Sequence, residues 1–154
     1  MSRTLILGLG NPILTDDGVG IRVARLLQER LADRPGVTVD EASLGGLRLL
    51  EVIGGYDRLI LVDAIQTANG QLGQAYRLDT GTFCATLHSG CTHDVDFFTA
   101  LELGRRMGMH IPEQIEIIAI EAGDVLTFGE TCTPAVEEAI PVAAEMVMET
   151  LTGA

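Results

Sequence analysis

Lysine is absent from the sequence, and all ten basic residues are arginine. Its absence excludes the lysine of a phosphate-binding loop, Schiff-base chemistry and a lysine general base. Serine is also scarce: it occurs only as Ser2, Ser43 and Ser89, and none of these stands in a Gly-x-Ser-x-Gly nucleophile elbow. The sequence therefore argues against several common forms of covalent catalysis.

Cysteine, positive charge and long apolar runs are also limited. The three cysteines are an odd number, so we do not expect a disulfide framework. The formal net charge of −12 argues against nucleic acid and anionic membranes as partners. No apolar run approaches the roughly 18 residues of a membrane span, and no basic segment followed by an apolar one opens the chain. We therefore expect a cytoplasmic protein.

The 154 residues, 47% of them apolar, predict one globular domain over residues 1–154. Apolar runs and helical spacings alternate along the chain. Strands are expected at 5–9, 37–39, 58–62, 75–78 and 114–120. Helices are expected at 17–33, 44–53, 95–107 and 134–151, with a polar loop bearing cysteine and histidine at 80–94. This alternation predicts an α/β three-layer sandwich, with a twisted, mostly parallel sheet and helices on both faces.

The turn after the first strand, GLGNPILTDDGVG at 8–20, begins like a dinucleotide fingerprint but does not complete it. The third glycine position is Ile13, and Pro12 removes one N–H from a phosphate cradle. Asp16 and Asp17 would repel a pyrophosphate. Nucleotide binding is therefore not expected, and the two aspartates need another explanation.

Three polar positions follow expected strands or precede a helix at one edge of the sheet. Asp17 leaves the first strand, Asp63 comes directly after the LILV strand at 59–62, and His93 precedes the helix at 95–107. Ordinary structural roles remain open: Thr15 or Asp16 would cap the first helix, and Asp17 could act likewise. Asp63 could bind loop N–H groups, and His93 could be a surface residue.

Ligands of α/β sheets collect outside the carboxyl ends of the strands. Two carboxylates and one imidazole there would suit a divalent transition metal with open coordination positions. An open position admits water or a substrate carbonyl, as metal-assisted hydrolysis requires. His110, beyond the helix, is expected to be a plain surface residue.

Several blocks of the sequence resemble the hydrogenase maturation endopeptidases. They are GLGNPILTDDGVGIRV at 8–23, ILVDA at 60–64, THDVDFFTALELGRRMG at 92–108 and IEAGDVLTFGETCTPAVEEAIP at 120–141. The resemblance implies a peptidase that trims the C-terminal extension from the nickel-loaded precursor of a nickel–iron hydrogenase large subunit. It also implies a twisted sheet between helices, in agreement with the pattern above.

The resemblance implies that Asp17, Asp63 and His93 contact nickel that belongs to the substrate rather than to the enzyme. Asp17 is one methylene shorter than the glutamate often found in the family's first loop. The loop after the second strand borders the family's cleft. Its Gly45 and Gly46 are expected to shape this loop, and Asp40 either contacts substrate or caps the next helix. We expect a monomer, because no heptad or interface stripe is visible.

Four alternatives compete with this interpretation. Peptidyl-tRNA hydrolases share the opening GLGNP, but no histidine precedes His88 here and the chain is acidic. A non-proteolytic, nickel-sensing chaperone would use the same ligands as the peptidase. A cysteine hydrolase would need Cys91 or Cys132 beside a histidine. The fourth alternative is a zinc site in the loop formed by Cys84, His88, Cys91 and His93.

Overall fold

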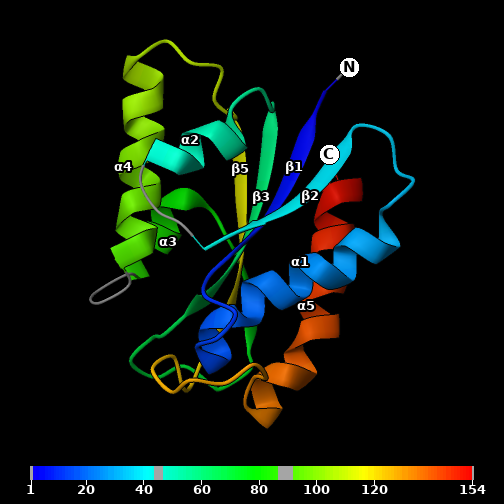
Figure 1. Ribbon diagram of the computed structural model, residues 1–154, viewed down its shortest axis with the longest axis vertical. Coiled ribbons are helices and arrows are strands. Elements are labelled where there is room, and N and C mark those ends of the chain that lie inside the picture. The colour runs from blue at the N-terminus through cyan, green and yellow to red at the C-terminus, as the bar shows by residue number, and fades with distance from the viewer. Residues whose placement is uncertain (1, 44–46, 87–91, 154) are drawn as a thin grey trace.

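In the computed structural model, five strands form one sheet (Figure 1). The structure describes residues 2–43, 47–86 and 92–153, without the side chains of residues 47, 84–86 and 92–97. The sheet order is β2-β1-β3-β5-β4. Neighbours among β2, β1, β3 and β5 run parallel, and β4 runs antiparallel to β5 at one edge. The strands are β1 (Thr4–Leu9), β2 (Val37–Ala42), β3 (Arg58–Ile65), β4 (Ala75–Leu78) and β5 (Gln114–Glu121).

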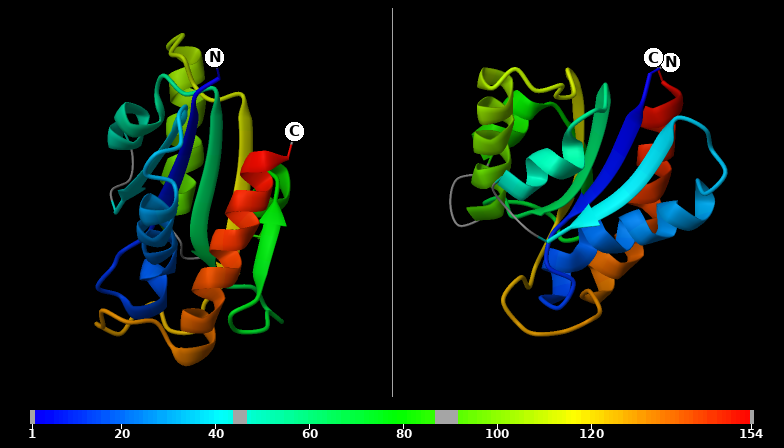
Figure 2. Two further views of the ribbon diagram at one scale, coloured as in Figure 1. Left: turned by 90° about the vertical axis from the view of Figure 1, so that its right-hand side faces the viewer. Right: turned by 45° about the horizontal axis from the view of Figure 1, so that its top comes forward.

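Helices cover both faces of this sheet (Figures 1 and 2). One apolar core lies between the sheet and the helices α1 (Val19–Arg30) and α5 (Pro134–Thr152). A second core lies on the opposite face, beneath α2 (Leu47–Ile53), α3 (Thr80–Thr86) and α4 (Thr92–Arg106). The predicted α/β sandwich with a mostly parallel sheet is confirmed. No helix in the described ranges is both long and apolar enough to cross a bilayer.

The strand β3 shows why the sheet needs two cores. Ile60 and Val62 are completely buried on the α1/α5 face, and Leu59 and Leu61 are completely buried on the other. Alternate side chains of a strand point to opposite faces. A strand that is apolar at every position can therefore be accommodated only between two helical layers.

Several element boundaries differ from those predicted; β2, for instance, continues to Ala42 instead of ending at residue 39. The segment 80–94 was predicted as a loop, but α3 occupies Thr80–Thr86 and α4 begins at Thr92. The first helix begins at Val19, after a 3₁₀ turn at Thr15–Gly18, instead of at residue 17. β3 continues to Ile65, beyond its pairing with β1, because β5 still pairs with its last three residues. Residues 44–46 of the helix predicted at 44–53 lie outside the described residues.

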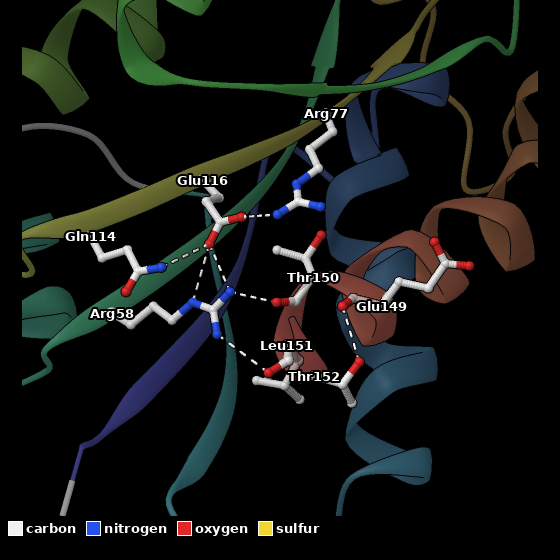
Figure 3. A network of polar contacts seen from close by, with 8 residues as sticks. All are labelled: Arg58, Arg77, Gln114, Glu116, Glu149, Thr150, Leu151 and Thr152. Carbon is white, nitrogen blue, oxygen red and sulfur yellow. Dashed lines mark hydrogen bonds and ion pairs between the residues drawn. The ribbon is translucent and has the colours of Figure 1, made fainter. Parts of the chain in front are cut away.

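A network of ion pairs and hydrogen bonds joins the end of α5 to the sheet (Figure 3). Arg58 Nη2 lies 2.7 Å from Glu116 Oε1, and Arg58 also donates to the carbonyl oxygens of Thr150 and Leu151. Arg77 Nη2 donates to the other Glu116 oxygen at 2.7 Å. Burial raises the pKa of Glu116, but the two arginines outweigh it and hold that pKa below its usual value. The guanidinium of Arg58 thus satisfies carbonyls that a helix C-terminus leaves without partners.

Candidate functional site

The order of the strands makes a topological switch point at the carboxyl ends of β1 and β3. From β1 the chain passes through α1 on one face to β2, and from β2 it returns through α2 on the opposite face to β3. The connections therefore diverge between two neighbouring strands. Such a switch point is where open α/β sheets bind their ligands. The loop after β1 carries Asp17, and the carboxyl end of β3 carries Asp63.

Asp17 faces back into its own loop. Its Oδ2 accepts the backbone N–H of Asn11 at 3.0 Å. In the described part of the chain, neither the 3₁₀ turn nor α1 has a side-chain cap hydrogen bond. The prediction that Thr15 or Asp16 caps the helix is therefore wrong. Asp17 also lines an open pocket of about 180 Å³ together with Leu9, Gly10, Asn11, Leu14 and Ser43.

Two glycines allow this loop and the start of α1 to approach neighbouring backbone closely. Gly10 has φ +147°, and a Cβ added there would lie 2.0 Å from the carbonyl oxygen of Asp17. A Cβ at Gly20 would lie 2.3 Å from the carbonyl oxygen of Val62. Only glycine permits such close backbone approach. The start of α1 therefore rests directly on the residue that precedes Asp63.

Asp63 is completely buried, and it lies within β3 instead of after it as predicted. Its register partner in β5 is Ala119. It follows Leu61 by two positions, so its side chain shares the face covered by α2, α3 and α4. Its Oδ1 accepts the N–H of Ala64 at 2.8 Å. A carboxylate within a strand whose neighbours are aliphatic is costly to bury.

Asp40 lies on β2, with Leu7 as its register partner, and shares the sheet face of Asp63. It is exposed, and its Oδ1 accepts the N–H of Glu41 at 2.8 Å. Its predicted alternative role as a cap of the next helix is wrong, because β2 continues to Ala42 and α2 begins at Leu47. A role in contacting substrate stays a prediction.

The backbone of His93 lies in the first turn of α4, at the carboxyl edge of the sheet. The end of α4 leads into the start of β5, which is parallel to β3 and so begins at the opposite edge of the sheet (Figure 1). The start of α4 therefore lies at the carboxyl edge. The His93 side chain lies outside those described, as do residues Gly45 and Gly46. The alternative zinc site also stays a prediction, because His88, Cys91 and the side chain of Cys84 lie outside the described residues.

Within the described residues, no three histidine, cysteine, aspartate or glutamate side chains gather closely enough to hold a metal ion. His110 lies at the exposed surface, as predicted, with Nε2 3.0 Å from Asp57 Oδ1.

Asp16 has a structural role that the sequence did not reveal. It is completely buried, and its carboxylate accepts three backbone N–H groups from the segment between β5 and α5. These are Gly123 and Asp124, each at 2.9 Å, and Thr133 at 2.7 Å; the Thr133 hydroxyl donates as well. Asp16 therefore fixes residues 122–133 against the loop that carries Asp17.

Comparison with known proteins identifies the family. The family model described as hydrogenase maturation protease matches residues 21–150. The chain belongs to the hydrogenase maturation protease family. The hydrogenase 2 maturation protease of Escherichia coli (strain K12) is 27% identical over 97% of this chain and 90% of its own length. The hydrogenase expression/formation protein HupD of Rhizobium leguminosarum bv. viciae is 28% identical over 97% of this chain and 74% of its own length.

Solved structures agree with this assignment. The hydrogenase maturating endopeptidase HybD from E. coli superposes with a TM-score of 0.82, at 27% identity, covering 97% of this chain and 91% of that one. The [NiFe] hydrogenase maturation protease HybD from Thermococcus kodakarensis has a TM-score of 0.74 at 23% identity, covering 96% and 98%, which supports the fold. Family membership confirms the predicted peptidase over the non-proteolytic chaperone and the peptidyl-tRNA hydrolase.

The thiol of Cys132 does not suit a protease nucleophile. Burial raises its pKa to about 11, and its Sγ lies 3.7 Å from the carbonyl oxygen of Thr15. Reactive cysteines have depressed pKa values and accessible sulfur atoms. The hydrolase in which Cys132 acts as nucleophile is therefore contradicted. The version that uses Cys91 lies outside the described residues.

Proposed function

We propose that this maturation protease removes the C-terminal extension from the precursor of a nickel–iron hydrogenase large subunit after nickel has been inserted. Asp17, Asp63 and His93 would contact the substrate's nickel, which serves as the recognition element. The observation that carries the proposal is the completely buried carboxylate of Asp63 at the switch point of the sheet. Aliphatic side chains would serve that position better if it only filled the core.

The donor set supports nickel as the recognised group. Imidazole suits nickel, and carboxylates complete a mixed nitrogen and oxygen set. With the precursor's nickel held at Asp17, Asp63 and His93, the adjoining peptide would be fixed beside the carboxyl ends of β1 and β3. Hydrolysis by water, without a covalent intermediate, fits a chain with no lysine, no nucleophile elbow and a protonated Cys132 thiol. The enzyme is proposed to act as a monomer in the cytoplasm.

The deciding experiment compares nickel-loaded and nickel-free precursor as substrates. Mass spectrometry of the products would follow cleavage by the wild-type protein and by the Asp63→Asn/His93→Ala double variant. We expect the wild type to cut only the loaded precursor, and the double variant to lose at least about 100-fold in rate. Asp33→Asn, at an exposed turn, is the matched control and should cleave normally. Full activity of the double variant would contradict the proposal.

A second measurement tests the first-loop ligand. Asp17→Asn removes the charge, and we expect it to abolish cleavage of the loaded precursor. Asp17→Glu restores the charge with one more methylene, which increases the reach toward the metal. We therefore expect the glutamate variant to remain active. Equal activity of the asparagine variant and the wild type would remove Asp17 from the ligand set.

A further inference from the structure

Large apolar side chains gather at the carboxyl edge of the sheet. Leu126 and Phe128, between β5 and α5, have 85% and 80% of their surface exposed. Ile13, in the loop after β1, and Leu72, in the loop after β3, are also exposed. We call these four residues the apolar rim. The remaining exposed large apolar side chains of the described residues lie elsewhere: Leu103, Met107 and Met109 at the end of α4 and just beyond it, and Val142 within α5.

Hydrogen bonds hold the loops of the apolar rim together. Gly129 donates its N–H to the carbonyl oxygen of Ile13 at 2.9 Å, and the N–H of Thr15 donates to the carbonyl oxygen of Gly129 at 3.0 Å. The Thr15 hydroxyl donates to the carbonyl oxygen of Thr127. A Cβ at Gly123 would meet Leu72 at 2.7 Å, so the loop after β3 packs against the same segment. The four rim residues thus lie on three loops that contact one another.

The backbone beneath the rim is fixed from inside. Asp16 binds both ends of the segment, at Gly123 and Thr133. Asp124 accepts the N–H groups of Thr127 and Leu126, at 2.9 and 3.1 Å, and these bonds hold its pKa below the usual range. An ordered loop that presents apolar side chains outward loses little conformational entropy on binding. Exposed aromatic and aliphatic anchors of this kind mark protein-binding surfaces.

Resting on the proposed function, we infer that the apolar rim is the docking surface for the folded body of the precursor, through an apolar patch bordered by basic residues. The rim is continuous with the candidate site, because Ile13 and Asp17 belong to one loop and Asp16 joins that loop to Leu126 and Phe128. A protein whose tail reaches Asp17 therefore passes beside the rim.

Charge selects the partner. The chain carries a net charge of −12, and the ionised Asp124 lies within the rim segment. A second copy would bring two such charges together and would be repelled, whereas a partner with basic residues around its patch would be attracted. The rim accordingly fits the precursor rather than a dimer of this chain.

The test measures cleavage and binding of the nickel-loaded precursor with a Leu126→Ser/Phe128→Ser variant. Because both side chains are exposed, we expect the thermal midpoint to stay unchanged. We expect KM and the dissociation constant for the precursor to rise about 30-fold, with kcat within about twofold of wild type. Met107→Ser, at an exposed apolar residue beyond the end of α4, is the matched control and should change neither value.

An unchanged KM and dissociation constant in the double variant would overturn the docking surface while leaving the proposed function standing. Failure of the wild-type protein to cut the precursor would overturn the proposed function. In that event, loss of precursor binding in the double variant alone would still support the rim. A wild-type dimer in sedimentation experiments that dissociates in the double variant would overturn the assignment of the precursor as occupant.

Discussion

The buried carboxylate of Asp16 allows a quantitative test of how the site loops are held. Asp16→Asn keeps the size of the side chain but replaces one acceptor oxygen with an NH₂ group. In one orientation of the amide, its NH₂ group points at the N–H groups of Gly123 and Asp124; in the other, it points at the N–H of Thr133. In both cases a donor faces a donor. Hydrogen bonds to a charged group contribute about 1.5–3 kcal/mol each. We therefore expect the variant to lose about 3–5 kcal/mol of unfolding free energy, through one or two lost bonds and the weakening of the others.

Urea denaturation measures the loss, and amide hydrogen exchange locates it. If the segment opens locally, the amides of Gly123, Asp124 and Thr133 should exchange faster while the strands of the sheet stay protected. Asp33→Asn, an exposed substitution of the same chemistry, should change the unfolding free energy by less than about 0.5 kcal/mol. An Asp16→Asn protein with wild-type stability and unchanged exchange at these three amides would refute the reasoning.

Three further substitutions and reactions test other parts of the structure. Glu116→Gln should cost about 1–3 kcal/mol at pH 7. Burial raises the pKa of Glu116, but the two arginines lower it by more, so the folded pKa lies below the unfolded pKa of about 4.3. The stability that the Glu116 carboxylate contributes is therefore present above the unfolded pKa and is lost as pH falls through the folded pKa. Urea midpoints of the variant and the wild type that differ equally at pH 3 and pH 7 would contradict this. Gly20→Ala should cost about 3 kcal/mol in thermal unfolding, because its Cβ would meet the backbone of Val62; an unchanged midpoint would refute that contact. Cys132 should react with iodoacetamide at pH 8 at least about 100-fold more slowly in the folded than in the urea-unfolded protein, since burial raises its pKa to about 11; peptide mapping that finds equal rates would contradict its burial.

Sequence alone determined the layered architecture of this protein. A strand that is apolar at every position, such as the LILV run of β3, must be buried on both faces, and the alternation of such strands with helices leaves few topologies. The same reasoning brought Asp17 and Asp63 to one edge, because parallel strands end together. Local spacing and strand direction carry this information, so no long-range contact was needed to predict it.

Tertiary structure decided the roles of the polar residues around that edge. The sequence predicted Thr15 or Asp16 as a helix cap, but the partners of Asp16 lie 107 to 117 residues away in the chain, where no local pattern indicates them. Asp63 lies inside β3 because the strand β5 extends the pairing, which a sequence cannot show for one strand considered alone.

The helix α3 is the plainest case of a structure that only packing creates. Its sequence, TGTFCAT, is rich in threonine and contains a glycine, both of which disfavour helices. Phe83 is completely buried in the core on the α2/α4 face, with its ring centroid 5.9 Å from that of Phe98. Burial of an aromatic ring is worth more than the propensity cost of these few residues. Intrinsic preference therefore predicted a loop, and packing against the sheet and the following helix α4 determined the outcome.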